Sequence, residues 1–283
     1  MKLGMYYQEF VLKLRPIYDL DEAENISDWV FEKILGLKRG ERYLQNDQEV
    51  NAGVEREIGV ILIRLLENEP LQYVLNESYF YKEKFYVDNS VLIPRPETEE
   101  LVDWIIKENK DRKDLKILDV GCGSGCISIS LKKYLPGNIV YGIDVSRATL
   151  KVAEKNSITL GAEVILQQLD FLNEDEWSKM KQFDIIVSNP PYIPLEDEIT
   201  MRKNVTDYEP HLALFVEDEM PMIFYEKLGS FCKLHLKEPG KIYVETNEKY
   251  ALEVKNIFVD NGLRNCEIKK DFFGKERMVY GSK

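Results

Sequence analysis

Apolar positions recur at helical spacing through the first 75 residues of the chain. They recur every three or four residues, as on one face of an amphipathic helix. Three such faces are formed by Phe10, Leu14 and Ile17; by Ile26, Trp29, Val30, Ile34 and Leu37; and by Val54, Ile58, Ile61, Leu62 and Leu65. The pattern predicts a small helical domain over residues 1–75.

The pattern changes after this region. The stretch "LQYVLNESYFYKEKFYVDNSVLIP" is rich in Tyr, Phe and Val, with turn residues at Asn76 and at Asp88-Asn89. It predicts a β-hairpin linker over residues 76–95. From residue 96 to residue 283, short β-branched runs alternate with amphipathic helical segments, which predicts an α/β domain with a mostly parallel sheet covered on both faces.

Composition narrows the class of protein. The 283 residues are 44% hydrophobic and 31% charged, as in ordinary globular proteins, and the formal net charge of −12 disfavours nucleic acid as the main partner. Four scattered cysteines and two histidines offer no zinc-ligand spacing, so we expect no metal site. We expect reduced thiols and a cytoplasmic location, with no membrane association, because no long apolar run or signal peptide is present.

A glycine-rich turn follows the predicted strand "KILDV". In "GCGSG", Gly121, Cys122, Gly123, Ser124 and Gly125 open a helix, and the glycines allow the backbone to turn tightly and to approach a ligand. The spacing is G-x-G-x-G, which differs from the G-x-G-x-x-G of dinucleotide-binding proteins. A tight turn without a ligand is the structural alternative.

Two acids and a phenylalanine at the ends of the next predicted strands complete a candidate nucleoside site. Asp144 ends "VYGID", where a carboxylate can accept both hydroxyls of a ribose, although it could instead cap the next helix in competition with Ser146. Asp170 and Phe171 end the third strand, where Asp170 could bond an adenine amino group and Phe171 could pack on the ring. Core packing is the alternative for Phe171.

The stretch "SNPPYIP" follows the apolar strand "FDIIV". The prolines lack N–H donors and end the strand, and the Asn189 side chain adds one acceptor and one donor. Asn189, Pro190, Pro191 and Tyr192 together offer two acceptors and an aromatic wall, which suits a planar –NH₂ group. A plain turn is the alternative interpretation.

These motifs resemble those of a known family. "DVGCGSG" with Asp144 is similar to the cofactor-binding half of class I S-adenosylmethionine-dependent methyltransferases, and "NPPY" resembles the signature of methyltransferases for planar nitrogens. "PRPETE", "DYEPHLALFVEDEM" and "DFFGKERMVYG" resemble segments of the glutamine methyltransferases for class-1 release factors. The resemblance covers nearly the whole chain. The sequence departs from the family pattern at "EPGK" and after Glu245, where Thr246 and Asn247 follow.

The resemblance implies a seven-stranded methyltransferase fold, S-adenosyl-L-methionine as cofactor and release factors as protein substrates. It implies that Asn189, Pro190 and Tyr192 act on the glutamine of a Gly-Gly-Gln motif, with Asn189 also near the cofactor. Arg95, Glu97 and Thr98 are expected to help cover the methionine end of the cofactor. The helical domain is expected to dock the release factor.

Two rival functions remain open from the sequence. An adenine methyltransferase acting on DNA or RNA would use the same "NPPY" on a flipped base. The acidic stretches "PLEDEIT" and "LFVEDEM" disfavour this rival because they would repel a phosphate backbone. A non-catalytic nucleoside-binding module is the rival from another class, and it would have no need of an amide-shaped pocket.

Overall fold

The computed structural model describes residues 1–283, and the chain divides into two compact units. The smaller unit comprises Met1–Glu77 with Arg202–Tyr208, and the larger comprises Ser78–Met201 with Glu209–Lys283. None of the helices is both long enough and apolar enough to span a bilayer.

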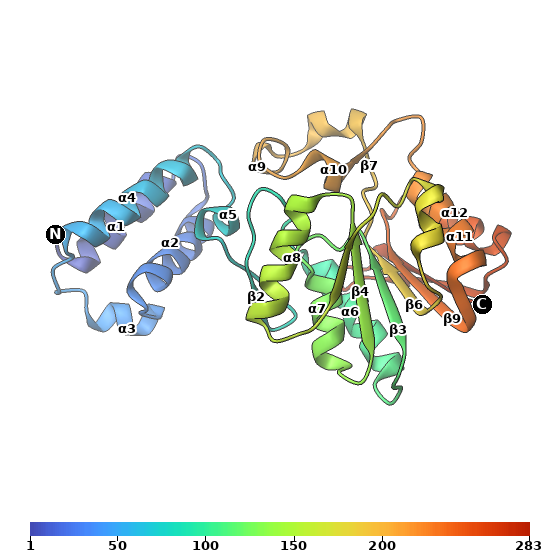
Figure 1. The fold of residues 1–283 in the computed structure, drawn as a ribbon. Coiled ribbons are helices and arrows are strands. Elements are labelled where there is room, and N and C mark those ends of the chain that lie inside the picture. The colour runs from blue at the N-terminus through green and yellow to red at the C-terminus, as the bar shows by residue number, and fades with distance from the viewer. The chain divides into compact units, whose positions relative to one another are not determined.

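The smaller unit is helical, as the apolar spacing predicts (Figure 1). Its helices are α1 (Leu3–Leu14), α2 (Leu20–Leu35), α3 (Arg39–Leu44), α4 (Ala52–Leu66), α5 (Leu71–Leu75) and α9 (Lys203–Thr206). Phe31 lies at the centre of an aromatic cluster, with the rings of Tyr7 and Phe10 at 5.3 and 5.5 Å. Ile17 was expected on the core face, but α1 ends before it and its side chain is exposed. The chain must leave the helix there to reach Asp19, whose carboxylate caps α2.

A buried ion pair joins two helices of this unit. The guanidinium of Arg42 on α3 lies 2.9 Å from the carboxylate of Asp28 on α2 and 3.4 Å from the ring centroid of Tyr7. The Tyr7 hydroxyl donates to the same carboxylate at 2.8 Å. Asp28 also lies 3.5 Å from the more exposed guanidinium of Arg39. Removal of Arg42 would leave this largely buried carboxylate with that weaker partner only, and incomplete compensation of a buried charge is costly.

We therefore expect Arg42→Ala to destabilise the helical unit by about 3 kcal/mol. The matched control is Lys2→Ala, because Lys2 pairs with Asp47 at 2.7 Å on the exposed surface. Exposed pairs contribute about 0–1 kcal/mol. Hydrogen exchange of the α1 and α2 amides would measure both effects, and equal protection in the two variants would contradict this prediction.

The larger unit contains the predicted seven-stranded sheet, which confirms the predicted fold class. Its strands are ordered β10-β11-β9-β6-β3-β4-β5, and β11 alone runs opposite to the other six. Their bounds are β3 (Lys116–Val120), β4 (Ile139–Asp144), β5 (Ile165–Gln168), β6 (Phe183–Ser188), β9 (Leu236–Glu245), β10 (Arg264–Lys270) and β11 (Glu276–Ser282).

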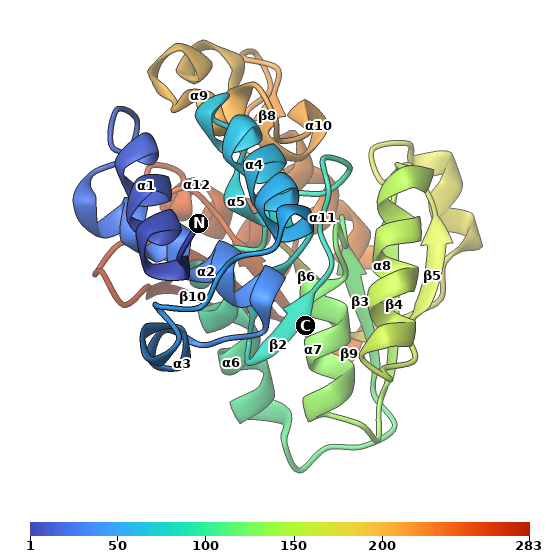
Figure 2. The same ribbon diagram turned by 90° about the vertical axis from the view of Figure 1, so that its left-hand side faces the viewer.

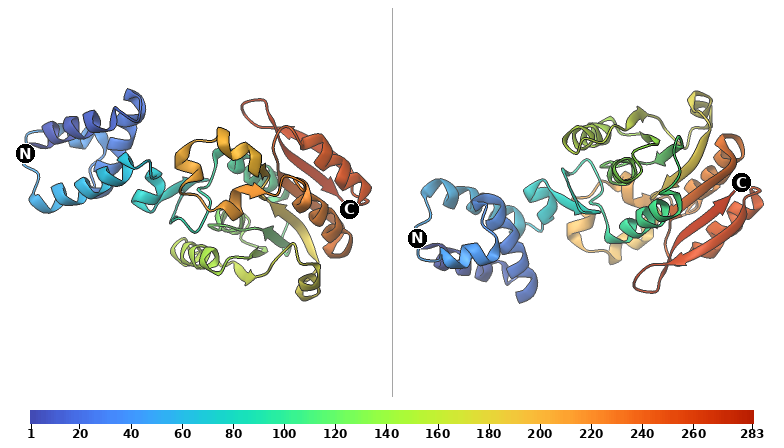
Figure 3. Two further views of the ribbon diagram at one scale, coloured as in Figure 1. Left: turned by 90° about the horizontal axis from the view of Figure 1, so that it is seen from above. Right: turned by 90° about the horizontal axis from the view of Figure 1, so that it is seen from below.

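Helices cover both faces of this sheet (Figures 1 and 2). On one face, α6 (Pro96–Asn109) and α7 (Cys126–Tyr134) pack on alternate residues of the central strands, with α8 (Arg147–Thr159) beside β4 and β5. On the other face lie α11 (Ile223–His235) and α12 (Ala251–Asp260), and Figure 3 shows α12 beside β10 and β11. Central strands with both faces buried explain the continuous apolar runs in the sequence.

Shorter elements complete the larger unit. The predicted hairpin consists of β1 (Ser78–Phe80) and β2 (Glu83–Phe85), which pair antiparallel within this unit. The remaining elements are η1 (Glu174–Lys179), β7 (Ile193–Pro194), η2 (Leu195–Thr200), α10 (His211–Leu214) and β8 (Phe215–Val216). After β3 the chain adds β4 and β5 toward one edge of the sheet. It then crosses back and forms β6 on the opposite side of β3, so the direction of strand addition reverses between β3 and β6. This reversal is the place where sheets of this kind bind ligands.

Candidate functional site

The glycine turn and the Asn-Pro-Pro-Tyr segment start side by side. Strands β3 and β6 are parallel neighbours, and Val120 is paired with Ser188 in their register. The Ser188 hydroxyl donates to the Val120 carbonyl at 2.8 Å. Gly121 and Asn189 therefore leave the sheet from adjacent positions, at the carboxyl ends of the two strands that flank the reversal.

The glycine turn requires glycine for its conformation. Gly121, Gly123 and Gly125 have φ of +71°, +55° and +81°, which side chains disfavour. No atom lies within 4 Å of the position that a Cβ would take on Gly121 or Gly123. The space above the turn is therefore open to a ligand that approaches the backbone closely.

Asp144 is connected to the turn by a backbone hydrogen bond. Its carboxylate accepts from the Gly123 N–H at 3.2 Å and from the Ser146 N–H at 2.9 Å. Helix α8 is capped by Ser146, whose hydroxyl oxygen accepts from the Thr149 N–H, so Asp144 is not its cap. Burial raises the pKa of the Asp144 carboxyl, and the hydrogen bonds from these N–H groups lower it by a smaller amount. Each oxygen retains a lone pair for a further donor.

The two predicted adenine residues differ in exposure. Asp170 is exposed, and its Oδ1 accepts from the Leu172 N–H at 3.0 Å. The Phe171 ring is buried, with the rings of Trp177 and Phe231 at 5.6 and 5.3 Å. Phe171 thus belongs to the core, as the structural alternative held, and its contact with adenine stays a prediction.

Cys122 and Ser124 contribute differently from the glycines. Cys122 is buried, and its N–H, like that of Gly121, donates to the Ile143 carbonyl at 2.9 Å. Burial raises the pKa of its thiol, so it is no thiolate at neutral pH. The Ser124 hydroxyl is buried and has no hydrogen-bond partner in the protein.

The sequence reasoning missed Asp119. It is fully buried at the end of β3, where Oδ2 accepts from the Ser128 N–H at 3.0 Å and Oδ1 has no partner. Burial raises the pKa of this carboxyl to about 7. A carboxylate inside an otherwise apolar strand was the signal that could have identified it.

Asn189 lies in a polar cluster that the sequence did not reveal. Its Nδ2 donates to the Thr98 hydroxyl at 3.0 Å, and that hydroxyl donates to Glu245 Oε2 at 2.6 Å. Tyr192 donates to Glu245 Oε1 at the longer distance of 3.5 Å. Glu245 ends β9, the neighbour of β6. The carboxyl ends of β3, β4, β6 and β9 thus supply the polar groups at this edge of the sheet.

The segment before α6 is held by an ion pair. Arg95 lies 2.5 Å from Glu209, a buried carboxylate of the "DYEPH" motif that also accepts from the Ile93 N–H. Of the three residues expected to cover the cofactor, Thr98 thus contacts Asn189 and Glu245, while Arg95 contacts Glu209. The cover role itself stays a prediction.

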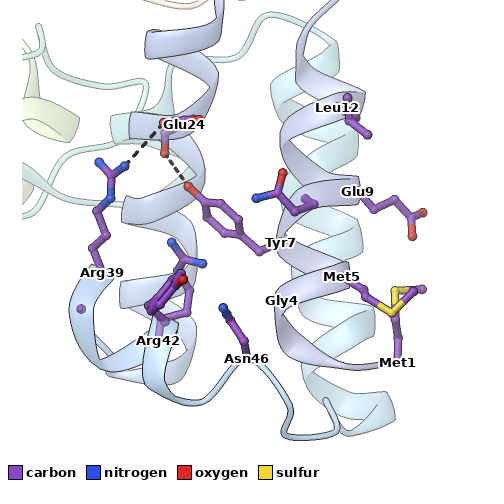
Figure 4. A pocket seen from close by; sticks show the side chains of 13 residues that line it. Met1, Gly4, Met5, Tyr7, Glu9, Leu12, Glu24, Arg39, Arg42 and Asn46 are labelled. Carbon is purple, nitrogen blue, oxygen red and sulfur yellow. Dashed lines mark hydrogen bonds and ion pairs between the residues drawn. The ribbon is translucent and has the colours of Figure 1, made fainter.

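The helical unit has a hollow of its own. It has a volume of about 970 Å³ and lies among α1, α2 and α3 (Figure 4). Met5, Leu12 and Tyr43 line it and are each more than 60% exposed. Arg39 lies 3.6 Å from Glu24 along the side of the hollow opposite α1. Exposed apolar side chains around a hollow are typical of an interaction surface.

Known proteins match both units of the chain. A family model described as the methyltransferase small domain matches residues 98–207, and one described as the PrmC N-terminal domain matches residues 7–75. The release factor glutamine methyltransferase of Flavobacterium psychrophilum is 40% identical over 282 residues, which cover 99% of this chain and 98% of that protein. That of Bacteroides thetaiotaomicron is 40% identical over 266 residues, covering 94% and 95%. The chain belongs to the release factor glutamine methyltransferase family.

Solved structures support the fold of this methyltransferase. A methyltransferase from Pyrococcus furiosus has a TM-score of 0.52 at 18% identity, covering 78% of this chain and 96% of that one. A 16S rRNA methyltransferase from Thermus thermophilus, solved with S-adenosylmethionine and guanosine, has a TM-score of 0.53 at 15% identity, covering 73% and 49%. At this level of identity the likeness concerns the fold alone.

S-adenosylmethionine is the cofactor of this methyltransferase family, and the residues at the sheet edge fit it. The open space above Gly121 and Gly123 admits a ligand against the backbone. The buried hydroxyl of Ser124, which lies within the turn and has no partner, and the free lone pairs of Asp144 offer further polar groups.

Proposed function

We propose that the chain methylates the side-chain amide nitrogen of the glutamine in the Gly-Gly-Gln motif of class-1 peptide chain release factors. The observation that carries the proposal is the placement of Asn189 and Pro190 beside the glycine turn, at the ends of paired strands. This arrangement puts two amide-sized acceptors next to a cradle for a nucleoside cofactor.

The difficulty of the reaction lies in the nucleophile, because an amide nitrogen shares its lone pair with its carbonyl. Asn189 Oδ1 and the Pro190 carbonyl each accept one N–H of the substrate amide and orient its nitrogen. Pro191 and Tyr192 wall the pocket and hold the amide plane. Positioning of this kind can lower a barrier by about 7–11 kcal/mol.

S-adenosylmethionine, when bound, supplies the methyl group on its sulfonium sulfur. The sulfonium sulfur would be the leaving group, and the substrate nitrogen would release one N–H proton to water. As positive charge develops on that nitrogen, the N–H bonds become more acidic. Their hydrogen bonds to Asn189 and Pro190 therefore strengthen in the transition state, which is where stabilisation raises the rate.

The cofactor-binding residues in this proposal are the turn from Gly121 to Gly125 with Cys122 and Ser124, Asp144 at the ribose, and Asp170 and Phe171 near the adenine. Asn189 borders both the cofactor and the substrate. Arg95 directly precedes α6, and Glu97 and Thr98 lie in its first turn, where Thr98 contacts Asn189.

We expect Asp144→Ala to weaken S-adenosylmethionine binding by about 1.5–3 kcal/mol, the contribution of hydrogen bonds to a charged group. Isothermal titration calorimetry measures the change. Asp175→Ala, on the surface of η1, serves as a control for loss of a negative charge. Unchanged affinity in Asp144→Ala would remove this carboxylate from the site.

One assay separates this function from its rivals. The protein is incubated with methyl-labelled S-adenosylmethionine and either release factor, release factor with its Gly-Gly-Gln glutamine replaced by alanine, DNA or RNA. Label on the unaltered release factor alone supports the proposal. Label on nucleic acid would favour the adenine methyltransferase, and cofactor binding without transfer to any of them would favour the non-catalytic module.

The features around the site favour the protein substrate. Three acids, Glu196, Asp197 and Glu198, lie on η2, which follows the Asn-Pro-Pro-Tyr segment after the two residues of β7. A phosphate backbone would be repelled there. We place the chain in translation termination, with the helical unit as the docking surface for the release factor. Its four free cysteines and its substrate fit a cytoplasmic location without membrane contact.

A further inference from the structure

A chain of two hydrogen bonds runs from Asn189 into the protein. Asn189 Nδ2 donates to Thr98 Oγ1 at 3.0 Å, and Thr98 Oγ1 donates to Glu245 Oε2 at 2.6 Å. Thr98 and Glu245 are each 2% exposed. Residues 98 and 245 come from the first turn of α6 and the end of β9, so tertiary packing alone brings them together.

The order of donors in this chain has a consequence for Asn189. A threonine hydroxyl has one hydrogen, and an ionised carboxylate can only accept. Since the Thr98 hydrogen goes to Glu245, Thr98 Oγ1 can only accept from Asn189. The Asn189 side chain must then present its NH₂ group to Thr98, and its Oδ1 faces the other way.

We propose that Thr98 and Glu245 are positioning residues that hold the Asn189 side-chain amide in the one orientation in which Oδ1 accepts from the substrate amide. This inference rests on the proposed function. With the amide rotated by 180°, Asn189 Oδ1 would face the lone pairs of Thr98, and its NH₂ group would face the NH₂ group of the substrate. Both contacts would be repulsive, and the nitrogen would not be oriented.

Several groups around Glu245 hold it in place and affect its charge. Tyr192 lies 3.5 Å from its Oε1, and Tyr225 donates to its main-chain carbonyl at 3.1 Å. Burial raises the pKa of the Glu245 carboxyl to about 7, and the nearby negative charge of Glu97 on α6 raises it further. The hydrogen bond from Thr98 and the positive charge of Arg277 on β11 act in the opposite direction and lower this pKa.

Ionisation of Glu245 sets the direction of the chain. A protonated Glu245 carries its own hydrogen and can donate it to Thr98, which frees the Thr98 hydrogen to point at Asn189. The orienting effect is therefore present above the pKa of Glu245 and is lost as the pH falls through it. The wild-type kcat should fall as the pH is lowered through about 7. Asp119, with a pKa also raised to about 7, is a second buried carboxyl that could produce such a fall.

The test uses the full chain with release factor and S-adenosylmethionine at saturation. In Thr98→Val, which keeps the shape and loses the hydroxyl, we expect kcat to fall about 30-fold at saturating cofactor. Thr98→Ser restores the hydroxyl and should recover kcat to within about threefold of wild type. Glu245→Gln should flatten the fall of kcat below pH 7, and Asp119→Asn should retain it.

Opposite outcomes overturn the inference. These are a Thr98→Val kcat within twofold of wild type, a Thr98→Ser variant as slow as Thr98→Val, or a pH dependence that persists in Glu245→Gln and vanishes in Asp119→Asn. Inactivity of the wild-type enzyme on release factor would instead overturn the proposed function.

A second measurement does not depend on activity. With ¹⁵N-labelled asparagine, the side-chain NH₂ group of Asn189 should exchange its hydrogens more slowly at pH 8 than a free amide does at that pH. This protection, expressed relative to the intrinsic rate at the same pH, should be lost in Thr98→Val and at pH 6. Equal exchange in wild type and Thr98→Val would show that the bond to Thr98 does not hold the amide. If Thr98→Val fails to fold, the pH profile of kcat in Glu245→Gln and the pH dependence of this protection in the wild type test the inference.

Discussion

Replacement of Asn189 by alanine should lower methyl transfer to release factor by about 10²- to 10³-fold, the usual effect of removing one preorganised hydrogen-bonding group from a transition state. Alanine cannot accept the substrate N–H, so the amide nitrogen is free to rotate out of line. The change should appear in kcat, because the bond strengthens as positive charge develops on the nitrogen. Single-turnover transfer of labelled methyl to release factor measures it directly.

The fold and the cofactor site should survive this substitution. Asn189 is partly exposed and follows β6, so its loss leaves the sheet register intact. Asn261→Ala is a matched control, because that side chain donates to the Ile257 carbonyl of α12. Turnover near the wild-type value in Asn189→Ala at saturating substrate would show that Asn189 does not orient the amide.

Removal of Met1–Glu77, the main part of the helical unit, should lower kcat/KM for release factor by about 100-fold, equivalent to about 2.7 kcal/mol of transition-state stabilisation. A glutamine side chain offers little surface, so recognition of one protein among many must come from contacts remote from the reacting atom. A chain that starts at Ser78 retains the larger unit, with the glycine turn, Asp144 and Asn189. It should bind S-adenosylmethionine as the full chain does.

A short Gly-Gly-Gln peptide separates docking from chemistry. Both chain lengths should methylate it weakly and at similar rates, because the peptide lacks the surface that the helical unit would contact. Equal rates of the two chains on intact release factor would mean that the helical unit only stabilises the protein.

Two leucine variants refine the docking test in the full chain. Leu12 lines the hollow of the helical unit and is 66% exposed, whereas Leu234 on α11 is 61% exposed. We expect Leu12→Ser to lower kcat/KM for release factor about 5-fold, since a small set of buried apolar anchors carries most of the energy of an interface. Leu234→Ser should have no effect, and equal effects would place docking elsewhere.

The sequence by itself determined the local features of this protein. Helical spacing predicted the first unit, and alternation of apolar runs with amphipathic segments predicted the sheet, because both patterns follow from the geometry of a single element. The Gly-x-Gly-x-Gly turn and Asn-Pro-Pro-Tyr are local too, since positive φ and missing N–H donors are properties of the residues themselves. The family resemblance then followed from their order in the chain.

Tertiary structure alone decided which distant groups meet. The sheet register placed Gly121 beside Asn189, and packing of α6 brought Thr98 to Glu245, 147 residues away. It also joined Arg95 to Glu209, 114 residues away, and placed Phe171 in the core. No pattern along the chain records such contacts, because a side chain that accepts a buried hydrogen bond has the same local sequence signal as one that faces water. The proposed orientation of Asn189 would be a property of the folded protein, set by Thr98 and Glu245, which lie far apart along the chain.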